Sequence, residues 1–131
     1  SSAASDVYKR QTNKSPAPIG PYNQAVMKND MLFISGQIAL EPVSMELNNS
    51  SIEDETNQVM LNIKNILNKS NMNFNNVVKT TIFLSDMSLF KDVNRIYGDY
   101  LEKGSEPARE TIAVKTLPMS VNVEISMIAI A

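Results

Sequence analysis

The segment 121–130 near the end of the chain constrains the fold most strongly, because it is apolar on both of its alternating sides. Its odd-numbered positions are all apolar, its even-numbered positions include two isoleucines, and Glu124 is its single charged residue. Neither face of such a strand is plainly in water, so the sheet that contains it needs a cover on each side. Helices can supply one cover, and other subunits are the economical source of the second.

Two amphipathic helices are expected earlier in the chain. The first begins at Ser51, where serines and early acidic residues accompany apolar residues at helical spacing, a typical capping pattern. The second begins at Ser88, carries apolar and aromatic residues on one face, and ends at Gly104. Helical spacing accounts for its aromatic residues, so these are interpreted as core residues and not as a base-stacking platform: Phe90, Tyr97 and Tyr100.

Five β-strands complete the predicted set. Segments 22–27 and 31–37 form a hairpin across residues 28–30, and Gly36 lets another group approach the backbone closely. β-Branched or apolar runs predict three further strands at 77–84, 107–114 and 121–130. The order β-β-α-β-α-β-β predicts an α+β fold, a two-layer sandwich in which both helices cover one face of a mixed sheet.

Composition limits the chemistry. The 131 residues fit one domain, taken as 16–131 behind a flexible arm at residues 1–15. Apolar and charged contents of 43% and 20% are ordinary for a globular protein, and no apolar run approaches the roughly 20 residues of a membrane helix. A formal charge of -2 makes nucleic acid a poor default partner. Because the chain has neither Cys nor His, disulfides, thiolate nucleophiles, Ser-His-Asp triads and nearly all zinc sites are excluded.

Two charged residues stand where burial is costly. Arg109 lies at the start of the predicted strand 107–114, and Glu124 lies inside the apolar segment 121–130. Charged side chains are rarely buried unless they pair with an opposite charge or take part in a functional site. One interpretation is a structural ion pair between them. The other is a site for a small anionic ligand, which requires Arg109 and Glu124 to face the same compartment.

Five blocks of the sequence follow one another in a recognisable order. They are residues 19–22, 34–38, 78–86, 93–94, and 107–109 together with 117–118 and 123–125. In this order they resemble the RidA family, also called the YjgF or L-PSP endoribonuclease family. The resemblance covers the chain from about Pro16 to its end. Members of that family are similar in being homotrimers with a chorismate-mutase-like fold, so the resemblance implies three clefts that lie between subunits. This agrees with the second cover that the sheet requires.

The resemblance also implies an activity, the hydrolytic deamination of reactive 2-imino or 2-amino-enoic acids, such as 2-iminobutyrate and 2-iminopropanoate, to 2-oxo acids and ammonia. By match to the family, Arg109 holds the substrate carboxylate through a two-point fork, and Glu124 positions or activates the attacking water. An iminium carbon is already electrophilic, so neither a metal nor another cofactor is implied. Further family positions imply substrate-binding groups at Tyr22, Ser35, Gly36, Asn94 and Thr111.

Four residues depart from the family pattern. Glu110 and Thr111 follow the arginine, where the family commonly has a small hydroxyl residue and often a cysteine; Ser105 and Glu106 stand where a bulky apolar residue is usual. Strand alternation places Thr111 on the side of Arg109 and Glu110 on the opposite side. Glu110 therefore competes for Arg109 only if the strand bulges.

Two other functions stay open at this point: an endoribonuclease or translation inhibitor, as some relatives are described, and a sensor that binds small carboxylates without turnover. Glu110, a carboxylate next to Arg109, is the feature that leaves the sensor as an alternative. The acidic net charge and the lack of His disfavour RNA cleavage. The expected partners are a 2-imino acid and two further copies of the chain, without a membrane. The expected location is the cytoplasm, with a mitochondrion or another organelle as the alternative.

Overall fold

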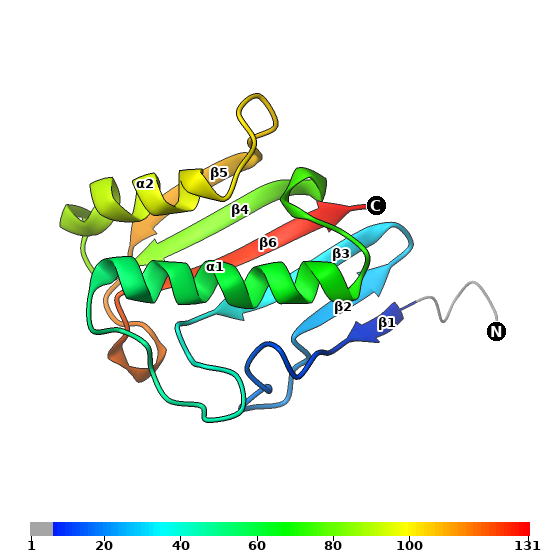
Figure 1. Ribbon diagram of the computed structural model, residues 1–131, viewed down its shortest axis with the longest axis horizontal. Helices are drawn as coiled ribbons and strands as arrows, with labels where there is room; N and C mark the ends of the chain where they lie inside the picture. The colour runs from blue at the N-terminus through cyan, green and yellow to red at the C-terminus, as the bar shows by residue number, and fades with distance from the viewer. Residues whose placement is uncertain (1–6) are drawn as a thin grey trace.

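A computed structural model describes residues 7–131, which form a six-stranded mixed sheet in the order β1-β2-β3-β6-β4-β5 (Figure 1). β4 and β5 run parallel, and the other neighbouring pairs run antiparallel. The strands are β1 (Val7–Arg10), β2 (Ala25–Lys28), β3 (Met31–Gln37), β4 (Val77–Leu84), β5 (Ala108–Ala113) and β6 (Val123–Ile130).

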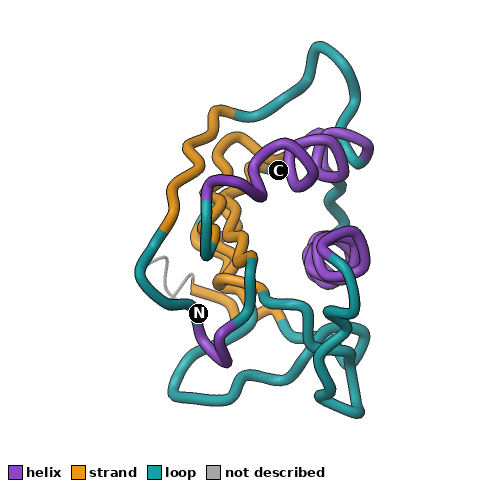
Figure 2. The backbone as a smooth tube through the Cα atoms, turned by 90° about the vertical axis from the view of Figure 1, so that its left-hand side faces the viewer, coloured by secondary structure: helices purple, strands orange, loops and turns teal. Residues whose placement is uncertain are grey.

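Two α-helices, α1 (Ile52–Lys69) and α2 (Phe90–Asp99), cover the same side of the sheet (Figure 2). α1 begins as predicted, because the Ser51 hydroxyl accepts a hydrogen bond from the backbone N–H of Asp54 at 3.0 Å. The hairpin of β2 and β3 is also confirmed. These elements confirm the α+β fold with two helices on one face of a mixed sheet, although β1 adds one strand at the start of the predicted order.

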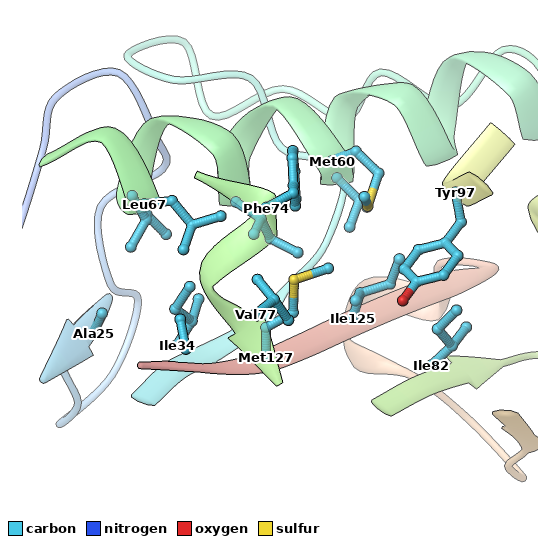
Figure 3. Close-up of a cluster of buried hydrophobic side chains, with 14 of the residues drawn as sticks. Ala25, Ile34, Met60, Leu67, Phe74, Val77, Ile82, Tyr97, Ile125 and Met127 are labelled. Atoms are coloured by element: carbon cyan, nitrogen blue, oxygen red, sulfur yellow. The ribbon is translucent and has the colours of Figure 1, made fainter. Parts of the chain in front are cut away.

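The hydrophobic core lies between the helices and the sheet (Figure 3). β6 runs through the middle of the sheet, and its side chains Val123, Ile125 and Met127 are at most 2% exposed. Met60 and Ile63 of α1 belong to the same buried cluster. Because side chains alternate along a strand, the remaining residues of β6, including Glu124, lie on the side away from the helices.

That side of the sheet stays open in the described chain and is partly apolar. Met31 pairs with Ile130, and Phe33 pairs with Ile128, across β3 and β6. Met31, Phe33, Ile130 and Ile112 of β5 are 37–47% exposed. Residues 7–131 of one chain thus supply only the first of the two covers expected from the sequence.

The second predicted helix is shorter than expected. The prediction of a helix from Ser88 to Gly104 is wrong at its end, because α2 stops at Asp99. The backbone N–H groups of Tyr100 and Leu101 donate to the carbonyls of Tyr97 and Gly98, respectively, which tightens the last turn and closes the helix. At the other end, the short 3-10 helix η3 (Met87–Leu89) precedes α2, and apolar periodicity does not distinguish the two.

Part of the predicted flexible arm is docked on the sheet. β1 pairs with β2, and the buried side chain of Gln24 binds the backbone of the segment between these two strands. Its amide nitrogen donates to the Ser15 carbonyl at 3.1 Å, and its carbonyl oxygen accepts from the Thr12 N–H at 2.7 Å. The Ser15 hydroxyl donates to the carbonyl of Asn62 in α1 at 2.6 Å. Residues 7–15 therefore belong to the folded domain, and the rest of the predicted arm, residues 1–6, lies outside the described residues.

Candidate active site, divided between two faces of the sheet

A cavity of about 380 Å³ opens beside Glu124. Four of the predicted site residues line it: Tyr22, Ser35, Gly36 and Glu124. Apolar residues from the segments before β2, after β3 and before β6 form much of the remaining wall. They are Pro16, Ala17, Ile19, Ile38, Leu40 and Pro118.

Glu124 is the acidic group of this cavity. Its carboxylate makes no hydrogen bond and no ion pair with any residue between 7 and 131. Burial raises the pKa of the carboxyl above its usual value near 4.5, because partial removal from water disfavours the charged form. A half-buried, unpaired carboxyl of this kind is available to exchange a proton with a ligand.

Gly36 is required beside that carboxyl. A Cβ atom at position 36 would lie 2.9 Å from Glu124 Cδ and 3.0 Å from its Oε1, closer than ordinary van der Waals contact. The prediction that Gly36 allows a close approach is confirmed, and the approaching group is Glu124 itself. Glycine is thus needed here for space.

Tyr22 and Ser35 use their hydroxyl groups locally. The Tyr22 side chain is 46% exposed, and its oxygen accepts from the Ile19 N–H at 3.4 Å. The Ser35 hydroxyl donates to the Asn23 carbonyl at 2.7 Å. Both residues line the cavity, but the proton of Ser35 is already engaged.

Arg109 lies in a second cavity, of about 460 Å³, together with the predicted site residue Asn94. Its Nη1 donates to Asn94 Oδ1 at 2.7 Å. Its guanidinium carbon lies 5.6 Å from the ring centroid of Phe90 and 5.3 Å from that of Tyr97. Because these three residues of α2 are spaced by four and three positions, they share one face of the helix, and this face holds the guanidinium in place.

Tyr97 links Arg109 to the sheet. Its hydroxyl donates to Thr80 Oγ1 at 3.0 Å, and Thr80 is the register partner of Arg109 in the β4–β5 pair. Burial raises the pKa of Tyr97, so the phenol keeps its proton for this hydrogen bond. The position of Arg109 therefore depends on both α2 and β4.

The two residues after Arg109 lie as strand alternation predicts. Thr111 pairs with the buried Ile82 on the helix side of the sheet, and its hydroxyl oxygen is buried without a hydrogen-bond partner in the described structure. Glu110 lies on the opposite side, where its carboxylate is 3.1 Å from the Lys79 ammonium. Glu110 thus pairs with Lys79 and does not compete for Arg109. Thr111 is not among the residues that line the Arg109 cavity.

Arg109 and Glu124 do not meet within one chain. Arg109 is on the helix side of β5, whereas Glu124 is on the open side of β6, and they line separate cavities. The structural ion pair considered from the sequence is therefore absent between residues 7 and 131. The requirement that both groups face one compartment is not met by a single copy.

The chain is similar to known proteins along most of its length. The family model described as endoribonuclease L-PSP matches residues 12–131. The chain belongs to this family, the RidA/L-PSP family. The mouse protein named 2-iminobutanoate/2-iminopropanoate deaminase is 45% identical over 119 residues, which cover 91% of this chain and 87% of the mouse protein.

Solved structures of RidA/L-PSP proteins have the same fold. A putative endoribonuclease from Thermotoga maritima is 41% identical, with a TM-score of 0.90 over 94% of this chain and 96% of that one. The structure of E. coli TdcF with bound serine is 30% identical, with a TM-score of 0.88 over 94% of this chain and 98% of that one. Both structures match the fold of this chain along nearly its whole length.

Two other structural findings bear on the site. In residues 7–131 no helix is long and apolar enough to cross a membrane. Within the same residues, no group of three or more His, Cys, Asp or Glu side chains is placed to hold a metal ion.

Sequence reasoning missed the support of Arg109 in this RidA/L-PSP chain. Phe90 and Tyr97 were assigned to the core alone, and they do contact it, but they also lie against the guanidinium. Helical periodicity shows only that the two rings share a face with Asn94. That Arg109 packs against this face depends on the pairing of β5 with β4, for which the local sequence gives no signal.

Proposed function

We propose that the chain hydrolyses reactive 2-imino acids, such as 2-iminobutanoate and 2-iminopropanoate, to 2-oxo acids and ammonia in clefts between copies of itself. The observation that carries this proposal is the division of the site. One face presents a fixed cation, and the other presents an unpaired carboxyl beside a cavity. Each half lacks the group that the other holds.

Arg109 is the group for the substrate carboxylate. A planar guanidinium can bind a carboxylate through two parallel hydrogen bonds, a geometry that Lys cannot reproduce. Contacts with Asn94 and two aromatic rings restrict its motion before substrate arrives. Such preorganisation lowers the entropy cost of placing the imine carbon.

Glu124 is the group for water. In its ionised form it accepts a proton from water while the water oxygen bonds to the electrophilic imine carbon. The product of this addition to the protonated imine is a carbinolamine, and the same carboxyl donates the proton to its nitrogen. The carbon–nitrogen bond then breaks, and the hydroxyl loses its proton to the departing ammonia as the carbonyl of the 2-oxo acid forms. A raised pKa suits this double role, because the group has to take up the proton and return it within one cycle.

A second copy of the chain is the source of the missing half-site. The open, partly apolar side of the sheet is the surface that requires cover, and Glu124 lies on that side. We infer a closed ring of three copies, in which Arg109 of one copy reaches the Glu124 cavity of the next. The name of the mouse relative and the serine bound to TdcF support a small amino-acid-derived carboxylate as the ligand.

Mixing two inactive variants tests both the activity and the division of the site. Arg109→Ala and Glu124→Gln are each expected to lose imine hydrolysis. Co-assembled in equal amounts, they are expected to recover about a quarter of wild-type activity, because about one cleft in four then combines an intact arginine with an intact glutamate. The readout is the rate at which 2-oxobutanoate forms from 2-iminobutanoate.

Other outcomes identify the competing functions. Failure of the mixture to recover activity, with an active wild type, contradicts the division of the site between copies. Binding of 2-oxobutanoate without any hydrolysis by the wild type indicates the carboxylate sensor. RNA cleavage that survives both substitutions indicates the ribonuclease.

A further inference from the structure

A second glutamate, Glu55, is buried completely in the first turn of α1. Its side chain is 0% exposed, and among residues 7–131 it makes no ion pair. Burying a carboxyl without a cation is costly unless hydrogen-bond donors replace the lost water. The contacts of Glu55 therefore indicate why a carboxyl is present at this position.

The donors to the Glu55 carboxyl come from Asn122 and from Val123, the first residue of β6. Its Oε2 accepts from the Asn122 N–H at 2.7 Å and from the Val123 N–H at 3.0 Å. Its Oε1 accepts from the Asn122 side-chain amide at 3.1 Å. Three donors thus hold the two oxygens of the carboxyl in place.

The same stretch of backbone is held from the other side by the end of β4. The Ser85 N–H donates to the Asn122 carbonyl at 2.9 Å, and the Ser85 hydroxyl donates to Asn122 Oδ1 at 2.9 Å. Asn122 is thus fixed between α1 and β4. The next residue after Val123 is Glu124, whose carboxyl has no hydrogen bond of its own within the described chain.

We propose that Glu55 is a positioning residue for Glu124: by clamping the two preceding backbone N–H groups, it sets the depth at which the Glu124 carboxyl sits against Gly36. The clearance there is small, with 2.9 Å between the position of a Gly36 Cβ and Glu124 Cδ. A shift in the start of β6 moves Glu124 directly, because one residue separates the clamp from the carboxyl. Since Glu124 is the water-handling group of the proposed hydrolase, this inference rests on the proposed function.

The test compares two substitutions of Glu55 with a control on the same helix. Glu55→Leu removes every acceptor, whereas Glu55→Gln keeps one acceptor oxygen at the same size. Ile66→Val is the control, because Ile66 is a fully buried residue of α1 that does not line either cavity of the proposed site. Thermal unfolding of all variants establishes how much stability each loses.

If Glu55 positions Glu124, its substitution is expected to lower kcat and to leave KM nearly unchanged. We expect kcat to fall at least about tenfold in Glu55→Leu, with an intermediate loss in Glu55→Gln, while KM changes by less than about threefold because Arg109 is untouched. If the Glu55 substitutions only loosened the packing of the core, their kcat would equal that of Ile66→Val once each value is corrected for the folded fraction. Equal kcat in Glu55→Gln and Ile66→Val overturns the proposal, and this comparison also decides if Glu55→Leu does not fold.

A measurement without substrate tests the role of Glu55 independently of the proposed hydrolase activity. The ¹³C chemical shift of the Glu124 carboxyl, assigned by its loss in Glu124→Gln, is expected to change in Glu55→Gln and to stay unchanged in Ile66→Val. If the wild type hydrolyses no imino acid, the proposed function fails and this shift alone tests the clamp. A Glu124 shift that is the same in wild type and Glu55→Gln overturns it.

Discussion

Replacing Gly36 by alanine is expected to abolish most of the activity while leaving the fold intact. The new Cβ would lie 2.9 Å from Glu124 Cδ. Carbon atoms are in relaxed contact at about 3.5–4.0 Å, so the carboxyl has to move by about 0.6–1.1 Å. A displacement of that size at a reacting group costs about 100-fold in rate, which corresponds to about 2.7 kcal/mol of transition-state stabilisation.

The stability of the Gly36→Ala variant is expected to change little. The backbone at Gly36 does not have a positive φ, so alanine adopts it without strain. The smaller entropy of the unfolded chain favours alanine by about 0.4–1 kcal/mol, which offsets part of the cost of moving the carboxyl. Glu124 can yield because its carboxyl has no partner in the described chain that resists the shift.

The assay is the conversion of 2-iminobutanoate, measured together with thermal unfolding. Ile34→Val on the same strand is the matched control, because Ile34 is 4% exposed and belongs to the core on the helix side. The control is expected to lose about 0.5–1.5 kcal/mol of stability and to keep its activity. A Gly36→Ala variant within threefold of wild type would refute the role assigned to the Glu124 position.

Three further predictions address the cation, the acid and the open face. Arg109→Lys is expected to lower kcat/KM by about 10-fold to 100-fold, because Lys cannot form the two parallel hydrogen bonds to the substrate carboxylate. The control Arg95→Lys, on the exposed side of α2, is expected to keep a kcat/KM near that of the wild type. Equal kinetics in the two variants would contradict the role of Arg109 in binding the carboxylate. Because burial raises the pKa of Glu124, the carboxyl becomes protonated at a higher pH than an exposed Glu, so kcat/KM is expected to fall as pH drops through a value above 4.5. A pH profile with its acid midpoint at or below 4.5 would contradict that assignment. Phe33→Glu, which places a charge on the open face, is expected to reduce the sedimentation mass to that of one chain and to remove activity, while Leu61→Glu on α1 does neither; both side chains are exposed in one chain, at 38% and 42%. An unchanged mass for Phe33→Glu would show that this face does not join copies.

The sequence by itself determined the two helices, apart from the end of α2, and five of the six strands, together with the direction of each side chain within its own strand. Alternation with a period of two placed Thr111 on the side of Arg109 and Glu110 on the other side, and the structure agrees. The serine at the start of α1 and the glycine at position 36 acted as predicted, because capping and close approach are local properties.

Only the tertiary structure decided which faces these side chains share. β6, the last strand in the sequence, inserts between β3 and β4, and this places Glu124 on the open face while Arg109 packs against α2 on the other. The contact between Glu55 and Asn122 joins residues 67 positions apart. Hydrophobic periodicity reports the environment of a residue relative to its neighbours in sequence, whereas strand order and helix docking depend on contacts between distant segments. The residues of the site were therefore recognisable from the sequence, but their division between two faces was not.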